Sequence, residues 1–193
     1  DNLKEISQAL RESLSRKPDF LLTIGGLGPT FDDMTLQGVA EALGKPLRVD
    51  PEALRMVEEK VKEMAEKGVL KKPWITRERE KMATLPEGSK PLFNPVGTAP
   101  GVELSTDETE TLIICMPGVP AEMKAIFDLH VRGKMATKSK LKYAEKSLLV
   151  EGIPEADFSP AIDEVIHRYP EVYVKSHPKG SEAVSRLELH LST

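Results

Sequence analysis

The chain has 193 residues, of which 27 are Lys or Arg and 31 are Asp or Glu, so its formal net charge is −4. This length accommodates one ordinary domain plus a small second one, and the mixed charges leave no basic surface for nucleic acid or anionic lipid. We find no apolar run near the roughly 18 to 20 residues of a membrane span, and no signal-peptide pattern. The single cysteine, Cys115, excludes an intrachain disulfide and a Cys-based metal site, which favours a reducing, cytoplasmic location.

The first segments predict a helix, a strand and a second helix. Apolar residues recur at helical spacing at Leu3, Ile6, Leu10 and Leu14, with Asp1 placed to cap this helix and Pro18 to end it. The stretch "DFLLTIGG" is short and continuously apolar, which is typical of a parallel strand covered on both faces. After a glycine turn, helical spacing returns at Leu36, Val39, Ala40 and Leu43, and Gly44 lies at the expected C-cap.

The middle of the chain repeats this pattern. "VDPEALRMVEEKVKEMAEKG" predicts a helix with Asp50 as N-cap, Pro51 at the first position, and an apolar stripe through Leu54, Val57, Val61 and Met64. A shorter helix stopped by Pro86 follows, and then two extended pieces flank a Pro/Gly-rich loop. "ETLIICMPGVPAEMKAIFDLHV" again predicts strand, turn and helix, the helix having one face of Met123, Ile126, Phe127 and His130 or Val131. Two such units predict an α/β sandwich.

The last third predicts a separate small domain. Residues 132–146 are basic and weakly patterned, so we interpret them as a linker. Residues 147–193 follow the order β-α-β-β, and their last strand alternates Leu187, Leu189 and Leu191 with polar residues, as in a sheet with one wet face. We therefore expect a first domain over 1–131, the linker, and a small α+β domain over 147–193.

The glycine turn within "FLLTIGGLGPTFDDMT" is a candidate phosphate site. Where an apolar strand ends in glycines before a helix, backbone N–H groups converge with the positive end of the helix dipole. Gly25, Gly26 and Gly28 would allow close approach, and Thr30 and Thr35 add hydroxyl donors. The alternative is a plain turn, since many such turns bind nothing. The pattern matches neither a P-loop nor a dinucleotide fingerprint.

Two carboxylates in the same turn need an explanation. Asp32 and Asp33 would repel a phosphate unless a divalent cation such as Mg²⁺ lies between them, or one of them caps the helix. They are therefore our candidates for metal ligands and for catalytic residues.

Two further loops are expected at the same edge of the sheet. "NPVGTAPG" contributes Asn94, Gly97, Thr98 and Gly101, and "MPGVPAEMK" contributes Pro117, Gly118 and Glu122. Each loop taken singly is explained as a plain turn, and Glu122 also complements a helix dipole. Three small-residue loops on one side of a sheet favour a ligand site. The histidines (His130, His167, His177 and His190) lack metal-ligand spacing, and we expect Cys115 and Trp74 to serve packing.

The three motifs "GGLGPTFDDMT", "NPVGTAPG" and "MPGVPAEMK", in this order, resemble the competence/damage-inducible CinA family and its archaeal stand-alone relatives. More widely, the first domain is similar to the molybdopterin-binding domain of molybdenum-cofactor biosynthesis proteins. The resemblance covers roughly Asp1 to Val131, and the trailing unit is similar to the small second domain of the same family. It implies a three-layer α/β/α sandwich with a mostly parallel sheet, and a pocket for a phosphorylated pterin or nucleotide at the strand ends.

The resemblance also implies an activity, namely metal-dependent cleavage of ADP-ribose and similar nucleotide diphosphates. The alternatives are a molybdopterin-directed step, either adenylylation or metal insertion, and a nucleotide- or pterin-binding module without chemistry. The deamidase activity of longer relatives belongs to a further C-terminal domain that we do not expect here. Family members normally begin with a strand and a "GDE" loop that nothing in this chain matches, so we expect part of the sheet and pocket to be missing. An exposed sheet edge favours a homo-oligomer, and related molybdopterin-binding domains commonly associate.

Overall fold

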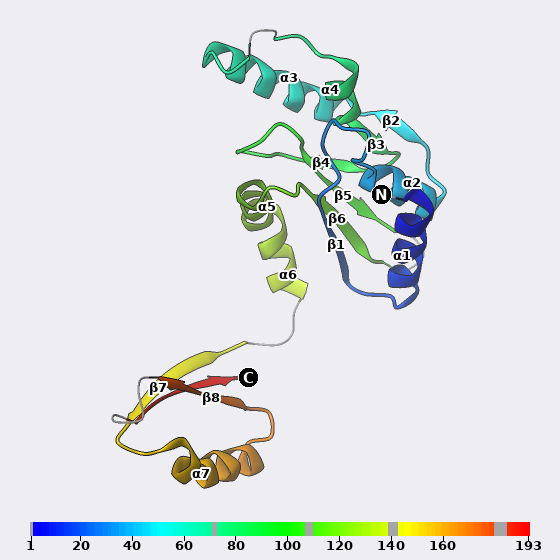
Figure 1. Ribbon diagram of the computed structural model, residues 1–193. Coiled ribbons are helices and arrows are strands. Elements are labelled where there is room, and N and C mark those ends of the chain that lie inside the picture. Colours follow the sequence, from blue (N-terminus) through cyan, green and yellow to red (C-terminus); the bar gives the residue numbers. More distant parts are fainter. Residues whose placement is uncertain (1, 71–72, 107–109, 139–142, 180–184) are drawn as a thin grey trace. The chain divides into compact units, whose positions relative to one another are not determined.

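The computed structural model describes residues 2–70, 73–106, 110–138, 143–179 and 185–193. The chain forms two compact units, Asp1–Thr137 and Lys138–Thr193. The elements of the first are α1 (Leu3–Ser15), β1 (Phe20–Ile24), α2 (Thr35–Leu43), β2 (Leu47–Val49), α3 (Pro51–Glu66), α4 (Arg77–Lys81), β3 (Thr84–Pro86), β4 (Lys90–Leu92), β5 (Gly101–Ser105), β6 (Leu112–Met116), α5 (Pro120–Ile126), the π-helical η1 (Phe127–Val131) and α6 (Arg132–Lys138) (Figure 1). No described helix is both long and apolar enough to cross a membrane.

The main sheet of the first unit has the strand order β1-β6-β5-β4. β1 runs parallel to β6, as expected for strands joined through several intervening elements, whereas β5 is antiparallel to both β6 and β4. The α/β class is confirmed, but a mostly parallel sheet is not what the described strands form. The reason is that β4, β5 and β6 are joined by short loops, and short connections produce antiparallel neighbours.

The sheet is covered by helices on both faces, which gives the three layers expected. Alternate residues of β6 point to opposite sides. Ile113 and Cys115 pack into a core shared with α1, α2 and α3, whereas Ile114 and Met116 pack with Ile126 and the helices that follow β6. Figure 1 shows α1 and α2 on one side of the strands and α5 and α6 on the other.

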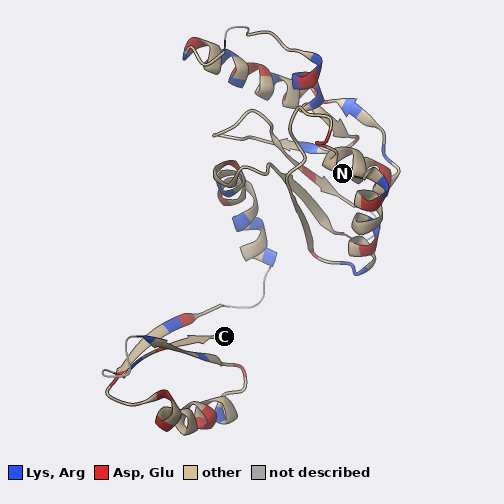
Figure 2. Cartoon of the chain, viewed as in Figure 1, with Lys and Arg blue, Asp and Glu red and all other residues tan. Residues whose placement is uncertain are grey.

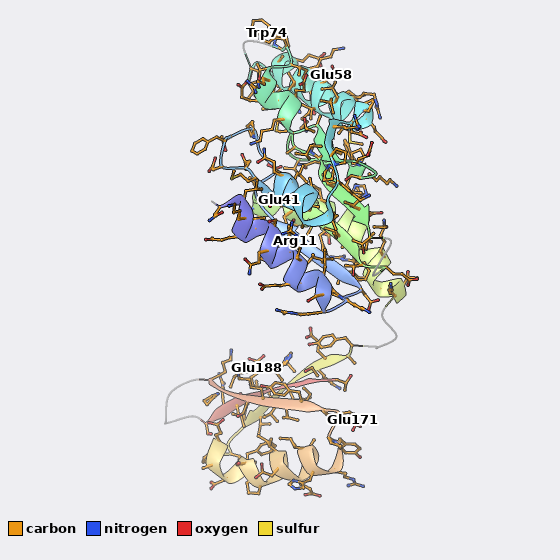
Figure 3. The ribbon with its side chains drawn as sticks, turned by 90° about the vertical axis from the view of Figure 1, so that its right-hand side faces the viewer. Arg11, Glu41, Glu58, Trp74, Glu171 and Glu188 are labelled. Atoms are coloured by element: carbon orange, nitrogen blue, oxygen red, sulfur yellow. The ribbon has the colours of Figure 1, made fainter. Side chains whose placement is uncertain are left out.

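α1 and α2 pack closely against each other. Asn2, rather than Asp1, caps α1, because its side chain accepts from the Lys4 N–H at 3.1 Å; Asp1 lies outside the described residues. Gly38 on α2 faces Ile6, and a Cβ at Gly38 would lie 2.3 Å from Ile6 Cγ2. At the rim, the Arg11 guanidinium donates to the Glu41 carbonyl oxygen at 2.8 Å, and both side chains are labelled in Figure 3.

α3 begins as the sequence predicts. The Asp50 side chain caps it by accepting from the Ala53 N–H at 2.8 Å, and Pro51 occupies the first position.

The strands on either side of α3 and α4 were not predicted. β2 and β3 form a separate antiparallel pair in which Leu47 faces Pro86, so Pro86 ends a strand rather than a helix. Figure 2 shows charges of both signs along the surface of α3 and few on the strands of the main sheet.

The helix after β6 is longer than predicted. Ile126 and Val131 are buried, which confirms the predicted apolar face, while the ring of His130 lies at the surface, with Nε2 3.0 Å from the Phe93 carbonyl oxygen. The helical run continues through η1 and α6 to Lys138, so residues 132–138 of the expected linker are helical. This stretch contains one glycine, no proline and mostly good helix formers. Residues 139–142 lie outside the described part.

The second unit has the predicted β-α-β-β order. It consists of β7 (Glu145–Glu151), α7 (Glu155–Arg168), β8 (Tyr173–Lys179) and β9 (Arg186–Ser192), with the antiparallel order β7-β9-β8. Leu187 and Leu189 of the central strand are buried, in agreement with the expected dry face. The sequence "PKGS" predicts a turn after the second strand of this unit, but Pro178 and Lys179 belong to β8, and residues 180 and 181 lie outside the described part.

Candidate functional site

Three loops of the first unit line one cavity of about 530 Å³. They follow β1, precede β5 and follow β6. Because β1 and β6 are parallel and Ile24 lies opposite Met116, both strands deliver their loops to the same edge of the sheet. The lining residues are Gly26, Leu27, Gly28, Pro29, Asp33, Val61, Met64, Leu70, Arg79, Met82, Thr98, Ala99, Pro117, Gly118, Val119 and Glu122.

The loops after β1 and β6 touch through their backbones. The Gly25 N–H donates to the Met116 carbonyl oxygen at 2.8 Å, and Gly25 has φ +95°. A Cβ at Gly118 would lie 3.3 Å from Gly25 Cα. The positive φ favours glycine at position 25, and a side chain at position 118 would need the backbone at Gly25 to shift by a few tenths of an ångström. Gly25 itself supports the cavity without lining it.

The cavity contains backbone donors that the protein leaves unused. Gly26, Leu27, Gly118 and Val119 all line it, and within the described residues their N–H groups have no hydrogen-bond acceptor. Backbone N–H groups in glycine-containing loops are well suited to anions because nothing bulky blocks their approach. This cluster is the structural basis for an anion site at the cavity.

Gly28 and Thr30, which we expect to bind a phosphate, hold the side chain of Asp33 in this structure. The Asp33 carboxylate accepts from the Thr30 N–H at 2.9 Å and from the Thr30 hydroxyl at 2.6 Å. A Cβ at Gly28 would lie 2.6 Å from Asp33 Oδ2, so glycine makes room for the carboxylate. Partial burial raises the pKa of Asp33, but the Thr30 hydroxyl, the N–H groups of Thr30 and Gly28, and nearby Lys81 outweigh it, so the net pKa is lowered.

The other polar residues of this turn lie off the cavity. Asp32 is exposed, with Oδ1 2.5 Å from the Thr30 hydroxyl oxygen. Thr35 donates its hydroxyl to the Gly25 carbonyl oxygen at 2.8 Å and so fixes the start of α2 to the glycine turn. Neither aspartate caps α2, whose N-cap is Met34. Within the described residues, no three His, Cys, Asp or Glu side chains are grouped so that they could hold a metal ion.

Asn94 lies behind the cavity and holds Glu122, which lines it. The Asn94 side chain is buried, and its Nδ2 donates to Glu122 Oε2 at 2.7 Å and to the Ala99 carbonyl oxygen at 2.8 Å. Its Oδ1 accepts from the N–H groups of Val96 at 3.0 Å and Gly97 at 2.9 Å. Asn94 thus positions Glu122 and does not itself line the main cavity.

The remaining residues of the second loop have different surroundings. Thr98 borders the main cavity and a neighbouring hollow of about 260 Å³, which Asn94 and Gly97 also line. Gly101 begins β5, and a Cβ there would lie 3.1 Å from Ile126 Cγ2, so its role is packing. Pro117 lines the main cavity, and its contact with a ligand stays a prediction.

Sequence reasoning missed five further residues that line the cavity, namely Val61, Met64, Leu70, Arg79 and Met82. Val61 and Met64 belong to the apolar stripe of α3, a pattern that does not distinguish core from cavity wall. Trp74, expected to anchor packing, is 56% exposed, whereas Cys115 is buried as expected, and burial raises the pKa of its thiol to about 11.

Comparisons with known proteins agree with this architecture. The family described as "Probable molybdopterin binding domain" matches residues 1–137. Protein TV0584 of Thermoplasma volcanium is 42% identical over 193 residues, which cover 100% of this chain and 70% of that protein. A protein of Pyrobaculum arsenaticum is 43% identical over 192 residues, or 99% of this chain and 68% of that one.

A solved structure is also similar, that of the protein CinA with unknown function from Thermoplasma acidophilum. It shares 40% sequence identity with this chain at a TM-score of 0.56, over 66% of this chain and 68% of that one. The three loop motifs, the α/β/α layers and these matches lead to one conclusion. The chain belongs to the molybdopterin-binding-domain family and is a CinA-like member of it.

Proposed function

We propose that the cavity binds a phosphorylated ring compound, either a pterin phosphate or a nucleotide. The observation that carries this proposal is the cluster of unused N–H groups at Gly26, Leu27, Gly118 and Val119 beside a mostly apolar wall. The phosphate would accept from the N–H groups, and a flat ring would pack against Val61, Met64 and Ala99.

Val119 allows one of these donors to be removed. Its φ of −70° is the value that proline requires, so Val119→Pro deletes the N–H with little backbone strain. We expect about tenfold weaker binding of a phosphorylated ligand, equivalent to ~1.4 kcal/mol. Val119→Ala, which keeps the N–H, is the matched control. Isothermal titration with a pterin monophosphate and with ADP-ribose measures the affinities and ranks the two ligand classes. Equal affinities of Val119→Pro and Val119→Ala would contradict the phosphate site.

A second candidate function is hydrolysis of a nucleotide diphosphate, favoured by the ionised Asp33 carboxylate at the cavity wall. Mg²⁺ is commonly held by one or two carboxylates, with substrate phosphates and waters completing its shell, so Asp33 suffices as an anchor although no three-residue group exists in the described part. When bound, such an ion would neutralise phosphate charge and acidify a water.

Product analysis of ADP-ribose incubated with several divalent ions tests this activity. We expect Asp33→Asn to abolish the turnover and Asp32→Asn, which changes an exposed carboxylate off the cavity, to retain it. Unchanged turnover in Asp33→Asn would remove that residue from the mechanism. Tight binding without turnover under any ion would favour a binding module without chemistry.

We also propose self-association of the first unit. Its sheet ends in two edge strands, β1 and β4, and Ile24 and Phe31 are 60% and 91% exposed. Open edges and exposed apolar side chains are commonly covered by a second subunit. Light scattering at micromolar concentration is expected to give an oligomeric mass; a monomeric mass would contradict the proposal.

A further inference from the structure

The Glu122 carboxylate is held more rigidly than a surface carboxylate needs to be. Asn94 donates to its Oε2, and the four hydrogen bonds of the Asn94 amide fix the direction of that donor. Gly97 completes the arrangement, since a Cβ there would lie 2.0 Å from Glu122 Oε2. The loop therefore leaves a space that the carboxylate fills.

The fixed carboxylate still has acceptor capacity. A carboxylate offers about four acceptor positions, and Asn94 occupies one of them. Within the described residues, no donor is bonded to Oε1. The surrounding wall includes the apolar side chains of Val61, Met64 and Ala99, which shield a ligand ring from water and strengthen its hydrogen bonds to the carboxylate.

We propose that Glu122 selects rings that present two adjacent N–H donors, a ring N–H beside an exocyclic amino group. Guanine and pterin rings carry this edge, whereas adenine places a ring acceptor beside its amino group, and that acceptor would face the carboxylate lone pairs. This inference rests on the proposed ring-binding function and adds to it the residue that sets ring specificity. It favours a pterin or guanine ligand over ADP-ribose, whose ring is adenine. A site built around a polar contact disfavours analogues that lack the matching donor.

The test is a binding series of three nucleoside monophosphates that share ribose and phosphate. GMP has both donors, IMP lacks the exocyclic amino group, and AMP has the reversed pattern. We expect the wild-type protein to bind GMP at least tenfold more tightly than IMP or AMP. Titration calorimetry at one pH and salt concentration gives the affinity ratios.

Two substitutions change the carboxylate by independent routes. Glu122→Gln keeps the shape and removes the charge, and Gly97→Ala places a methyl group where the carboxylate lies. In both variants we expect the GMP/IMP ratio to fall to about two or less, because GMP loses both contacts to the carboxylate. IMP, which keeps the ring N–H, should lose less affinity than GMP, and AMP affinity should change little. Glu58→Gln, on the exposed surface of α3 (Figure 3), is the control and keeps the wild-type ratio. Thermal melting verifies that each variant is folded.

The outcomes separate this inference from the proposed function. Equal binding of GMP and IMP by the wild-type protein, or an unchanged ratio in Glu122→Gln, overturns the inference alone. A uniform loss for all three nucleotides in Glu122→Gln would mean that the carboxylate contacts the shared ribose, and this also overturns it. If neither the nucleotides nor a pterin monophosphate binds to the wild-type protein, the proposed function and the inference both fail.

Discussion

At the scale of single residues, the ionised Asp33 carboxylate orders the turn after β1 through its hydrogen bonds. Its folded-state pKa is lowered, so the ionised form stabilises the protein above the unfolded pKa of about 3.9, and this contribution is lost as the pH falls through the folded value. We expect Asp33→Asn to lower the free energy of unfolding by about 1 kcal/mol at pH 7. Urea unfolding measures this, and the difference from wild type should shrink below about pH 4.

The control for this prediction is Asp32→Asn, because Asp32 is exposed and no hydrogen bond to the backbone fixes it within the described residues. We expect it to leave stability at pH 7 nearly unchanged. Equal stability of both variants across the pH range would show that Asp33 does not order the turn.

Two glycines with positive φ separate the cost of backbone conformation from the cost of space. Gly44 has φ +63° with nothing near its Cβ position, whereas Gly26 has φ +72° and a Cβ there would lie 2.1 Å from Thr35 Oγ1. Gly44→Ala should cost about 1 kcal/mol from the backbone term. Gly26→Ala should cost clearly more and weaken ligand binding, because it also displaces Thr35. Thermal melting and titration of both variants check this; similar melting points would contradict the crowding at Gly26.

The contact between α1 and α2 gives a prediction at the scale of elements. Gly38→Ala would improve helix propensity by about 1 kcal/mol if Gly38 were exposed. Here the new methyl group would meet Ile6 Cγ2, and overpacking of this kind costs roughly 1 to 3 kcal/mol. We therefore expect net destabilisation in chemical unfolding.

Ile6→Leu removes the Cγ2 branch and provides the rescue. The double variant Ile6→Leu/Gly38→Ala should be more stable than the sum of the two single effects predicts, since the substitutions share one contact. Additive effects would mean that α1 and α2 do not meet through these two side chains.

The elements that local patterns define could be predicted, and those that long-range pairing defines could not. β1 and α3 follow from a continuous apolar run and from the Asp50–Pro51 start, which act within a few residues. β2 and β3 are three residues long and pair across α3 and α4, so their sequences carry little strand signal. α6 was missed because its basic composition resembled a linker.

The same distinction applies to the candidate site. The three glycine-rich loops could be identified because turns require particular residue types, and parallel strands place their ends together. The hydrogen bonds from Thr30 to the Asp33 carboxylate could not be predicted, since they depend on how the turn folds back on itself. The role of Asn94 likewise depends on a contact with Glu122, 28 residues away.

At the scale of the whole molecule, the chain forms two units, and the described residues that line the cavity, from Gly26 to Glu122, belong to the first. The second unit has a core of its own, and a substitution there tests the stability of that unit. Leu187 of β9 is 1% exposed, and Leu187→Ala should destabilise that unit by roughly 2 to 5 kcal/mol. Calorimetric melting of the full chain checks this; an unchanged melting profile would contradict the burial of Leu187 in the core of that unit.

Because β1 and β6 end at paired residues, insertions and deletions within these strands would disturb the site. Gly25 and Gly118 meet because both strands stop after paired residues, Ile24 and Met116. Inserting one residue into either strand would move its loop by about 3.3 Å and turn its side chains to the opposite face. Related sequences can therefore vary the residues of the loops, but they should not tolerate insertions or deletions within β1 or β6. Alignments of functional relatives should show no gaps within these two strands.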